Sequence, residues 1–206
     1  MPNWCNNYIE VSHEDPSKIR ALADALNNGE FCSHVIPTPK ELTETVAGSV
    51  GEDKRAEHEA QMASNLEKFG HTDWYSFQTS RWGTKWDVGG DGQTDIHPDG
   101  KTLFTTFDSA WSPPVNAYQK LEQLGFRVSA QFYESGMAFA GVYEDGNCED
   151  FSLEGMTADE IERDYPELDE AFCIAEAIRE FQEEEEEELT EWIKDGVDKN
   201  LELKSL

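Results

Sequence analysis

The sequence predicts an α+β fold in which helices cover one face of an antiparallel sheet. Two observations indicate this class. Residues 126–132 alternate between apolar and polar side chains, which is typical of a strand with one buried face. Residues 16–26 instead place apolar side chains three and four positions apart, which is typical of a helix that buries one side. Other segments of both kinds follow along the chain.

The first strand is expected at residues 4–11 and the first helix at residues 16–26. In the strand, one face collects Cys5, Asn7, Ile9 and Val11. The helix has a favourable start, because Asp15 can accept hydrogen bonds from free backbone N–H groups and Pro16 is tolerated at the first helical position. Asn28-Gly29 is a suitable end.

Residues 41–69 are polar and helix-prone, with few large apolar side chains. We therefore expect a helical insertion at about 40–80 that lies on the surface. Its last part is an aromatic helix that begins at Trp74 and ends near Gly83.

The remaining elements complete the sheet. Strands are expected at 86–88 and 101–108, a helix at 115–124, and a hairpin of strands at 126–132 and 137–143. Without the insertion the order is strand, helix, strand, strand, helix, strand, plus one extra strand. This is the ferredoxin-like split βαβ arrangement, and it assigns residues 1–145 to one domain.

Negative charge is concentrated near the end of the chain. The whole chain has 44 acidic and 16 basic residues, a net charge of −28. Residues 145–206 contain 23 of the acidic and 5 of the basic residues, a net charge of −18. Such a field repels phosphate groups and attracts basic protein surfaces. We therefore expect a protein partner with a basic surface and no direct binding to nucleic acid.

Residues 146–206 are expected to form an acidic helical extension. Thr157 and Glu160 have capping-box spacing, and an apolar stripe from Leu168 to Phe181 has helical spacing. An acidic block of this kind is commonly a solvated tail. The alternative is mimicry of a nucleic-acid backbone. The residues expected to attract the partner are Asp169, Glu176, Glu180, Glu183, Glu184, Glu185, Glu186, Glu187 and Glu188.

A second candidate site is rich in tryptophan. Trp82, Trp86 and Trp111 lie near ends of expected strands, with Lys85 and Asp87 beside them. Aromatic side chains can stack against a base, so these five residues are a candidate ligand pocket. The alternative is that the three tryptophans pack in the core.

The sequence offers little for catalysis or metal binding. Asp87, Asp91 and Asp95 surround a glycine-rich loop, but their spacing is not that of an EF-hand, and Asp is common in such turns. The four cysteines include no CxxC pair. We therefore expect no metal and no cofactor, and the sequence favours a binding function over an enzymatic one. With no signal peptide and no apolar run of about 20 residues, a cytoplasmic protein with reduced thiols and no membrane partner is expected.

Short motifs resemble a known family. They are MPNWCNN at 1–7, VIPTPKEL at 35–42, WGTKWD at 82–87, FDSAWSPP at 107–114 and YESGMAFAG at 133–141. Together they are similar to the YubB-like proteins of phages and conjugative plasmids. The resemblance covers roughly residues 1–145 and implies a ferredoxin-like domain and a mobile-element origin, but no catalytic residues.

These observations predict a non-enzymatic phage or plasmid accessory protein that binds a host protein in the host cytoplasm. Acidic mimicry of nucleic acid would make it an inhibitor of a host defence system. The alternative is a nucleotide or small-molecule binding protein, or a nucleotide-processing enzyme, that uses the tryptophan-rich pocket.

Overall fold

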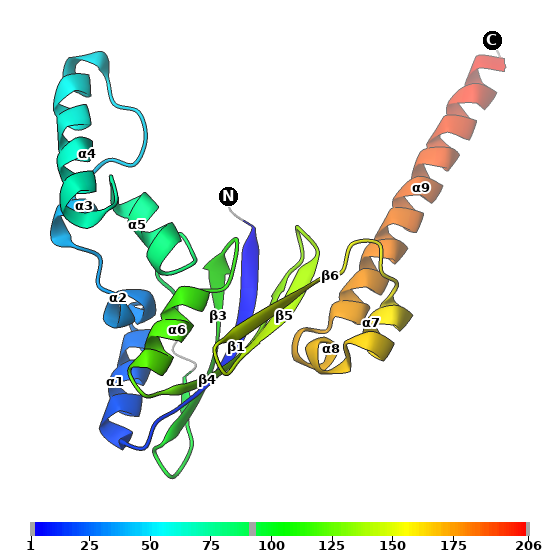
Figure 1. The fold of residues 1–206 in the computed structure, drawn as a ribbon. Coiled ribbons are helices and arrows are strands. Elements are labelled where there is room, and N and C mark those ends of the chain that lie inside the picture. Colours follow the sequence, from blue (N-terminus) through cyan, green and yellow to red (C-terminus); the bar gives the residue numbers. More distant parts are fainter. Residues whose placement is uncertain (1–2, 91–93, 205–206) are drawn as a thin grey trace. The chain divides into compact units, whose positions relative to one another are not determined.

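The computed structural model describes residues 3–90 and 94–204, without the side chains of Leu189, Glu191 and residues 193–204. The chain divides into two compact units, Met1–Ser152 and Leu153–Leu206. The first unit holds the sheet and the second is helical (Figure 1). The predicted α+β class is confirmed.

The sheet of the first unit has six strands in the order β2-β3-β1-β4-β5-β6, and all neighbours are antiparallel. The part β2-β3-β1-β4 has the strand order of the split βαβ arrangement. β5 and β6 extend the sheet beyond β4. The strands are β1 Trp4–Ser12, β2 Asp95–Ile96, β3 Thr102–Ala110, β4 Arg127–Glu134, β5 Phe139–Glu144 and β6 Asn147–Ser152.

Helices α1 (Pro16–Asn27), α2 (Phe31–Val35) and α6 (Val115–Gln123) lie on one side of this sheet (Figure 1). Burial alternates along β1, as the sequence predicts, with Cys5, Asn7, Ile9 and Val11 buried. The opposite β1 face is exposed. The core therefore lies between the three helices and one face of the sheet. Its large members include Ile9, Ile19, Leu22, Leu26, Phe31, Leu103, Phe107, Tyr118, Leu121 and Tyr143.

The insertion is helical, as expected, and consists of α3 (Lys40–Thr43), a 3-10 turn η1 (Glu52–Lys54), α4 (Arg55–Phe69) and α5 (Trp74–Arg81). A capping box fixes the start of α5. Asp73 Oδ1 accepts a hydrogen bond from the backbone N–H of Ser76 over 2.8 Å, and the Ser76 side chain bonds back to Asp73. This start determines where the aromatic residues of α5 lie.

The prediction of a strand at residues 86–88 is wrong, because this segment forms no strand. Gly90 donates its N–H to the carbonyl of Leu26 at the end of α1, over 2.7 Å, so this backbone pairs with a helix end. Gly89 has φ +100, and a Cβ there would clash with the Leu26 carbonyl, so this approach requires glycine. The second strand is the two-residue β2 instead.

The strand β6 was not predicted, because Asn147–Ser152 is mostly exposed and lacks an apolar alternation. The sheet therefore continues past residue 145, where the acidic extension was expected to begin. Asp145 and Gly146 both have positive φ, at 48° and 79°. The Asp-Gly pair is a recognised signal for a two-residue hairpin turn, and it could have revealed this strand.

The second unit contains α7 (Ala158–Asp164), α8 (Pro166–Phe172) and α9 (Ile174–Lys204). The capping box predicted at Thr157 and Glu160 is present. Arg179 of α9 contacts Asp159 at 3.2 Å and Glu162 at 2.8 Å, which ties α9 to α7. Within the described residues, no helix combines the length and apolar character needed to cross a membrane.

Candidate functional site

The structure brings together two of the sequence motifs, residues 82–87 and 107–114. The Ser112 hydroxyl donates to the Gly83 carbonyl over 2.6 Å, and the Thr84 hydroxyl donates to the Ala110 carbonyl over 3.0 Å. Gly83 has φ +92, and a Cβ there would lie 3.2 Å from the Pro113 oxygen. The close approach of the two segments therefore depends on glycine at this position.

Two of the five predicted pocket residues have clear structural roles. Trp82 is 2 % exposed, and its Nε1 donates to the Ile36 carbonyl over 2.8 Å, so it belongs to the core. Asp87 Oδ1 accepts from the Cys32 N–H over 2.6 Å, and Oδ2 accepts from the Ser33 N–H over 3.0 Å. The Asp87 carboxylate therefore holds the first turn of α2 against the loop.

The other three predicted residues meet at the surface. Lys85 Nζ lies 4.6 Å from the ring centre of Trp86, 5.1 Å from that of Trp111 and 5.7 Å from that of Tyr75. We call Lys85 with these three rings the Lys85 cage. The ammonium group is attracted to the negative faces of the rings, an interaction worth about 0.5–1 kcal/mol at exposed sites.

Trp111 adopts an unusual backbone conformation in this cage. Its φ is +70, which is costly for a bulky L-residue, and its side chain is still 41 % exposed. A hydrogen bond of 2.9 Å from its N–H to the Asn3 carbonyl holds the backbone. A large ring is thus kept at the surface by a strained residue, a combination that is common at functional sites.

The sequence prediction did not include Trp4 and Tyr75 in the site. Trp4 packs against Trp86, with ring centres 5.8 Å apart, and Tyr75 packs edge-on against Trp111 at 6.4 Å. All four rings are between 38 % and 46 % exposed. Trp4 lies on the solvent-facing side of the first predicted strand. A large aromatic residue at such a position could have indicated that Trp4 belongs to a surface site.

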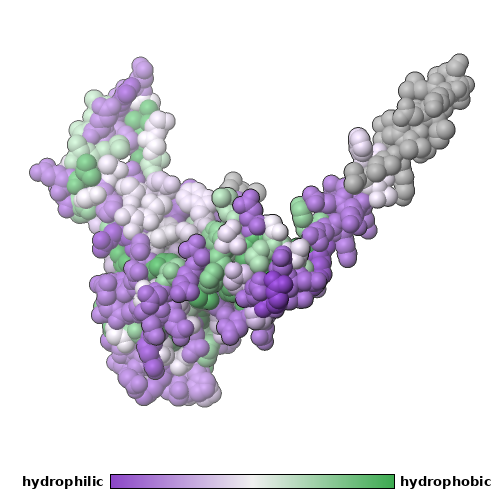
Figure 2. All heavy atoms as spheres, turned by 45° about the vertical axis from the view of Figure 1, so that its right-hand side comes forward, coloured by the Kyte–Doolittle hydropathy of each residue, from purple (hydrophilic) through white to green (hydrophobic). Residues whose placement is uncertain are grey.

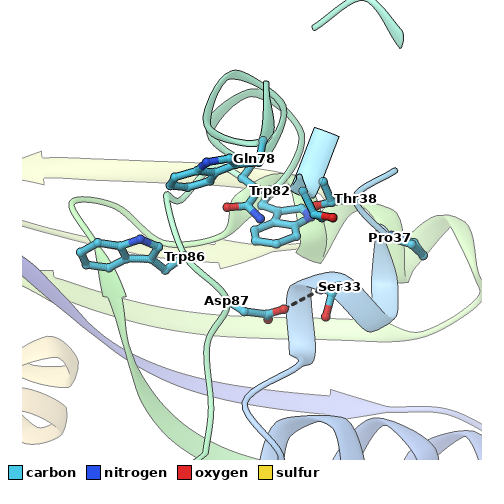
Figure 3. A pocket seen from close by; sticks show the side chains of 9 residues that line it. Ser33, Pro37, Thr38, Gln78, Trp82, Trp86 and Asp87 are labelled. Carbon is cyan, nitrogen blue, oxygen red and sulfur yellow. Dashed lines mark hydrogen bonds between the residues drawn. The ribbon is translucent and has the colours of Figure 1, made fainter. Parts of the chain in front are cut away.

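A separate cavity lies beside the Lys85 cage, and Trp86 contributes to both (Figure 3). Its volume is about 410 Å³. Lys85 and Trp111 do not line it. We call it the indole cavity, and its lining residues are Ser33, Pro37, Thr38, Thr43, Trp74, Gln78, Trp82, Trp86 and Asp87. The Thr38 hydroxyl is buried and makes no hydrogen bond with any described residue.

A buried polar network underlies the sheet, but it is satisfied internally. The Asn7 amide donates to the Cys5 carbonyl and the Ser109 hydroxyl, each over 2.8 Å, and accepts from the Tyr118 hydroxyl over 3.3 Å. Burial raises the pKa of the Cys5 thiol to about 12 and the pKa of Cys32 well above its usual value. Both thiols are therefore protonated at neutral pH and poor nucleophiles.

The acidic helix α9 exposes most of the predicted partner-binding residues. Glu176, Glu180 and the glutamate run, residues 183–188, are all exposed, and the described part of α9 is hydrophilic on the face in view (Figure 2). Among the described residues, no lysine, arginine or histidine pairs with the run. Asp169 differs, because its Oδ1 accepts from the Ala175 N–H over 2.7 Å at the start of α9.

The aspartates around the glycine-rich loop do not form a visible metal site. Asp87 is engaged with α2, Asp95 is exposed on β2, and Asp91 lies outside the described residues. In the part of the chain that the structure describes, no group of three or more His, Cys, Asp or Glu side chains could hold a metal ion.

Comparisons with known proteins give little further information. No protein-family model matches the chain, and no curated protein matches it. One similar solved structure is the crystal structure of a protein api92 from Yersinia pseudotuberculosis, family-model DUF1281. The match has 10% sequence identity and a TM-score of 0.39, and covers 74% of this chain and 98% of that one. A similarity this weak assigns neither a family nor a function.

Proposed function

We propose that this chain is a non-enzymatic accessory protein of a phage or plasmid that binds a host protein with a basic surface. The binding element is the exposed glutamate run of α9, which imitates a nucleic-acid backbone. The target is a host defence or nucleic-acid-processing protein in the cytoplasm, and the chain inhibits it by occupying its basic groove. The origin rests on the resemblance to the YubB-like proteins, and the binding mode rests on charge.

The charge density of the glutamate run carries this proposal. An α-helix rises about 1.5 Å per residue, so six consecutive glutamates place one charge per about 1.5 Å of axis. Double-stranded DNA carries one charge per about 1.7 Å. A surface that binds DNA by its charge therefore meets a similar field along this part of α9. Steering by such a field speeds association and weakens with salt.

Within the second unit, a comparison of paired and unpaired acidic residues also supports a binding role for the glutamate run. Asp159 and Glu162 share one cationic partner, Arg179, which offsets about half of their combined charge within the unit. The six glutamates of the run are exposed and have no such partner among the described residues. Keeping like charges adjacent on one helix costs stability. This cost is understandable if the charges serve binding.

Nucleotide binding by the tryptophan-rich segment stays an alternative with less support. Only Trp82, Trp86 and Asp87 of the five predicted residues line the indole cavity. The unit that contains the cavity has 24 acidic and 11 basic residues, a net charge of −13. That field opposes an approaching phosphate group.

The proposal is tested by replacing all six glutamates of the run with glutamine. The matched control neutralises six exposed acidic residues of the first unit, Glu10, Asp24, Glu41, Glu57, Glu67 and Glu144. Both variants change net charge equally. Affinity capture from host cells should lose its basic partner with the first variant and keep it with the control. Equal loss in both variants would show that only overall charge matters, and the proposed role of α9 would fail.

A further inference from the structure

We infer that the indole cavity receives a guanidinium group, presented as an arginine side chain by the basic partner. This inference rests on the proposed function, because it assumes a basic protein ligand. It adds an anchoring site on the first unit to the attraction exerted by α9. Arginine and tryptophan are among the residues that dominate binding energy at protein interfaces.

The residues that line the cavity suit a planar cation. Its walls include the indole rings of Trp74 and Trp86 and the side chain of Gln78 (Figure 3), whereas Trp82, at 2 % exposure, offers little surface. A guanidinium group is planar and weakly hydrated, and it stacks on aromatic faces. Tryptophan is the best aromatic partner for a cation. The volume of about 410 Å³ lies in the range of ordinary ligand pockets.

Two polar groups in the wall can receive its N–H donors. Asp87 accepts three backbone hydrogen bonds, from Cys32, Ser33 and Val88. An ionised carboxylate has about four acceptor positions, so one remains. Gln78 also lines the cavity, and its side-chain oxygen is a second acceptor. A guanidinium group presents five donors, so it can use both.

One of the three rings that line the cavity, that of Trp86, already has a cation beside it. Trp86 holds the Lys85 ammonium 4.6 Å from its ring centre, in the Lys85 cage. The net charge of −13 on the first unit favours a cationic ligand over an anionic one. Lys85 itself repels a second cation, and its removal therefore has opposite effects on cationic and anionic ligands. That difference gives the inference a sharp test.

The first experiment follows the indole N–H signals of the ¹⁵N-labelled full chain by NMR. The Trp86 signal is assigned by its loss in Trp86→Ala. Titration with N-acetyl-arginine amide should shift the Trp86 signal saturably. The signal of Trp192, an exposed residue of α9, serves as a control. The uncharged isostere N-acetyl-citrulline amide should bind at least about tenfold more weakly. Equal binding of the two probes, or no shift with either, would overturn the inference.

The second experiment uses Lys85→Met, with AMP as the competing class of ligand. Removing a like charge should strengthen arginine-amide binding about two- to threefold at low salt and weaken any AMP binding. Trp86→Ala should abolish arginine-amide binding, whereas Trp111→Ala should retain it, because Trp111 lies outside the cavity. Thermal unfolding checks that each variant is folded. Tighter AMP than arginine-amide binding, weakened by Lys85→Met, would assign the cavity to nucleotides and contradict the inference.

These probes separate the cavity from α9. The small arginine probe should bind the variant with six glutamines in α9 as it binds the unmodified chain, within about twofold at high salt. If that variant loses the basic partner and binds the probe, both proposals are supported. If the probe does not bind while α9 captures a basic partner, only the inference about the cavity fails. If the probe binds but capture does not depend on α9, only the proposed function fails.

Discussion

The Asp87 carboxylate lies 2.6 Å from the backbone nitrogen of Cys32 and also accepts hydrogen bonds from Ser33 and Val88. A residue predicted to lie at the rim of a ligand pocket therefore joins the 82–90 loop to the start of α2. The same loop carries Trp86, so this contact also positions the shared wall of the indole cavity and the Lys85 cage.

Asp87→Ala should reduce the free energy of unfolding by about 2–4 kcal/mol, because it removes the acceptor of three backbone donors, two of them in α2. Asp87→Asn should lose less, since an amide oxygen in place of Oδ1 still accepts from the Cys32 and Val88 N–H groups. Urea titration followed by tryptophan fluorescence measures both. A loss below about 0.5 kcal/mol for the alanine variant would show that this contact contributes little to stability.

Trp82 and Trp86 should respond differently to truncation. Trp82→Ala removes a side chain that is 2 % exposed and should cost about 3–5 kcal/mol. Trp86→Ala removes one that is 38 % exposed and should cost about 1 kcal/mol. Chemical denaturation of the two variants in parallel gives the comparison. Similar losses for both would contradict the separation of a core residue from a surface residue.

Stability should fall in alkaline solution because of the buried thiols. The pKa of Cys5 is raised from 9.0 to about 12, so the unfolded chain loses this proton first as the pH rises. Between pH 9 and 12 the folded state binds more protons, and stability falls by up to about 1.4 kcal/mol per pH unit for this thiol. Denaturation at several pH values should show a shallower decline in Cys5→Ala. An unchanged slope would contradict the assignment.

Accessibility should divide the four cysteines into two pairs. Cys148 and Cys173 are exposed, whereas Cys5 and Cys32 are buried; the pKa of Cys148 is raised too, so burial rather than thiol acidity separates the pairs. Iodoacetamide at pH 8 should therefore label the first pair in the native protein and all four in urea. Peptide mass spectrometry locates the labels. Rapid native labelling of Cys32 would show that α2 opens readily.

Replacing the glutamate run with glutamine should raise the helical content of the chain. Like charges at i,i+3 and i,i+4 cost a few tenths of a kcal/mol per pair, and glutamine removes the repulsion. Circular dichroism at 222 nm, at low salt, measures the change, and added salt should produce part of it in the unmodified chain. Equal signals in both proteins at low salt would show that the run is not under electrostatic strain.

The order of the helices and strands could largely be predicted from the sequence, because most of them follow from the local pattern of apolar and polar residues. The β1 face pattern, the α1 cap at Asp15 and the Thr157 capping box depend on neighbouring residues alone. The strand expected at 86–88 failed because a distant residue decides that backbone. Leu26 lies some sixty positions earlier and accepts the Gly90 N–H. Local patterns do not reveal such a contact.

The candidate site was predicted as a set of residue types, and the structure divides that set. Of the five predicted residues, Trp82 packs in the core and Asp87 holds the start of α2. The other three, Lys85, Trp86 and Trp111, belong to the Lys85 cage together with Tyr75. Which side of a loop each side chain faces depends on Gly83 and its contact with the 107–114 segment. Tyr75 enters the cage from α5, whose position follows from the insertion.

The most direct test of the account measures the affinity of the captured basic partner for the full chain at about 50 and 500 mM salt. The proposed function predicts tight binding that weakens at least about tenfold with salt, and loss of most of that affinity and salt dependence when the six glutamates become glutamine. Binding that is unchanged by salt and by the glutamine substitutions would contradict the claim that α9 acts as an anionic mimic of nucleic acid.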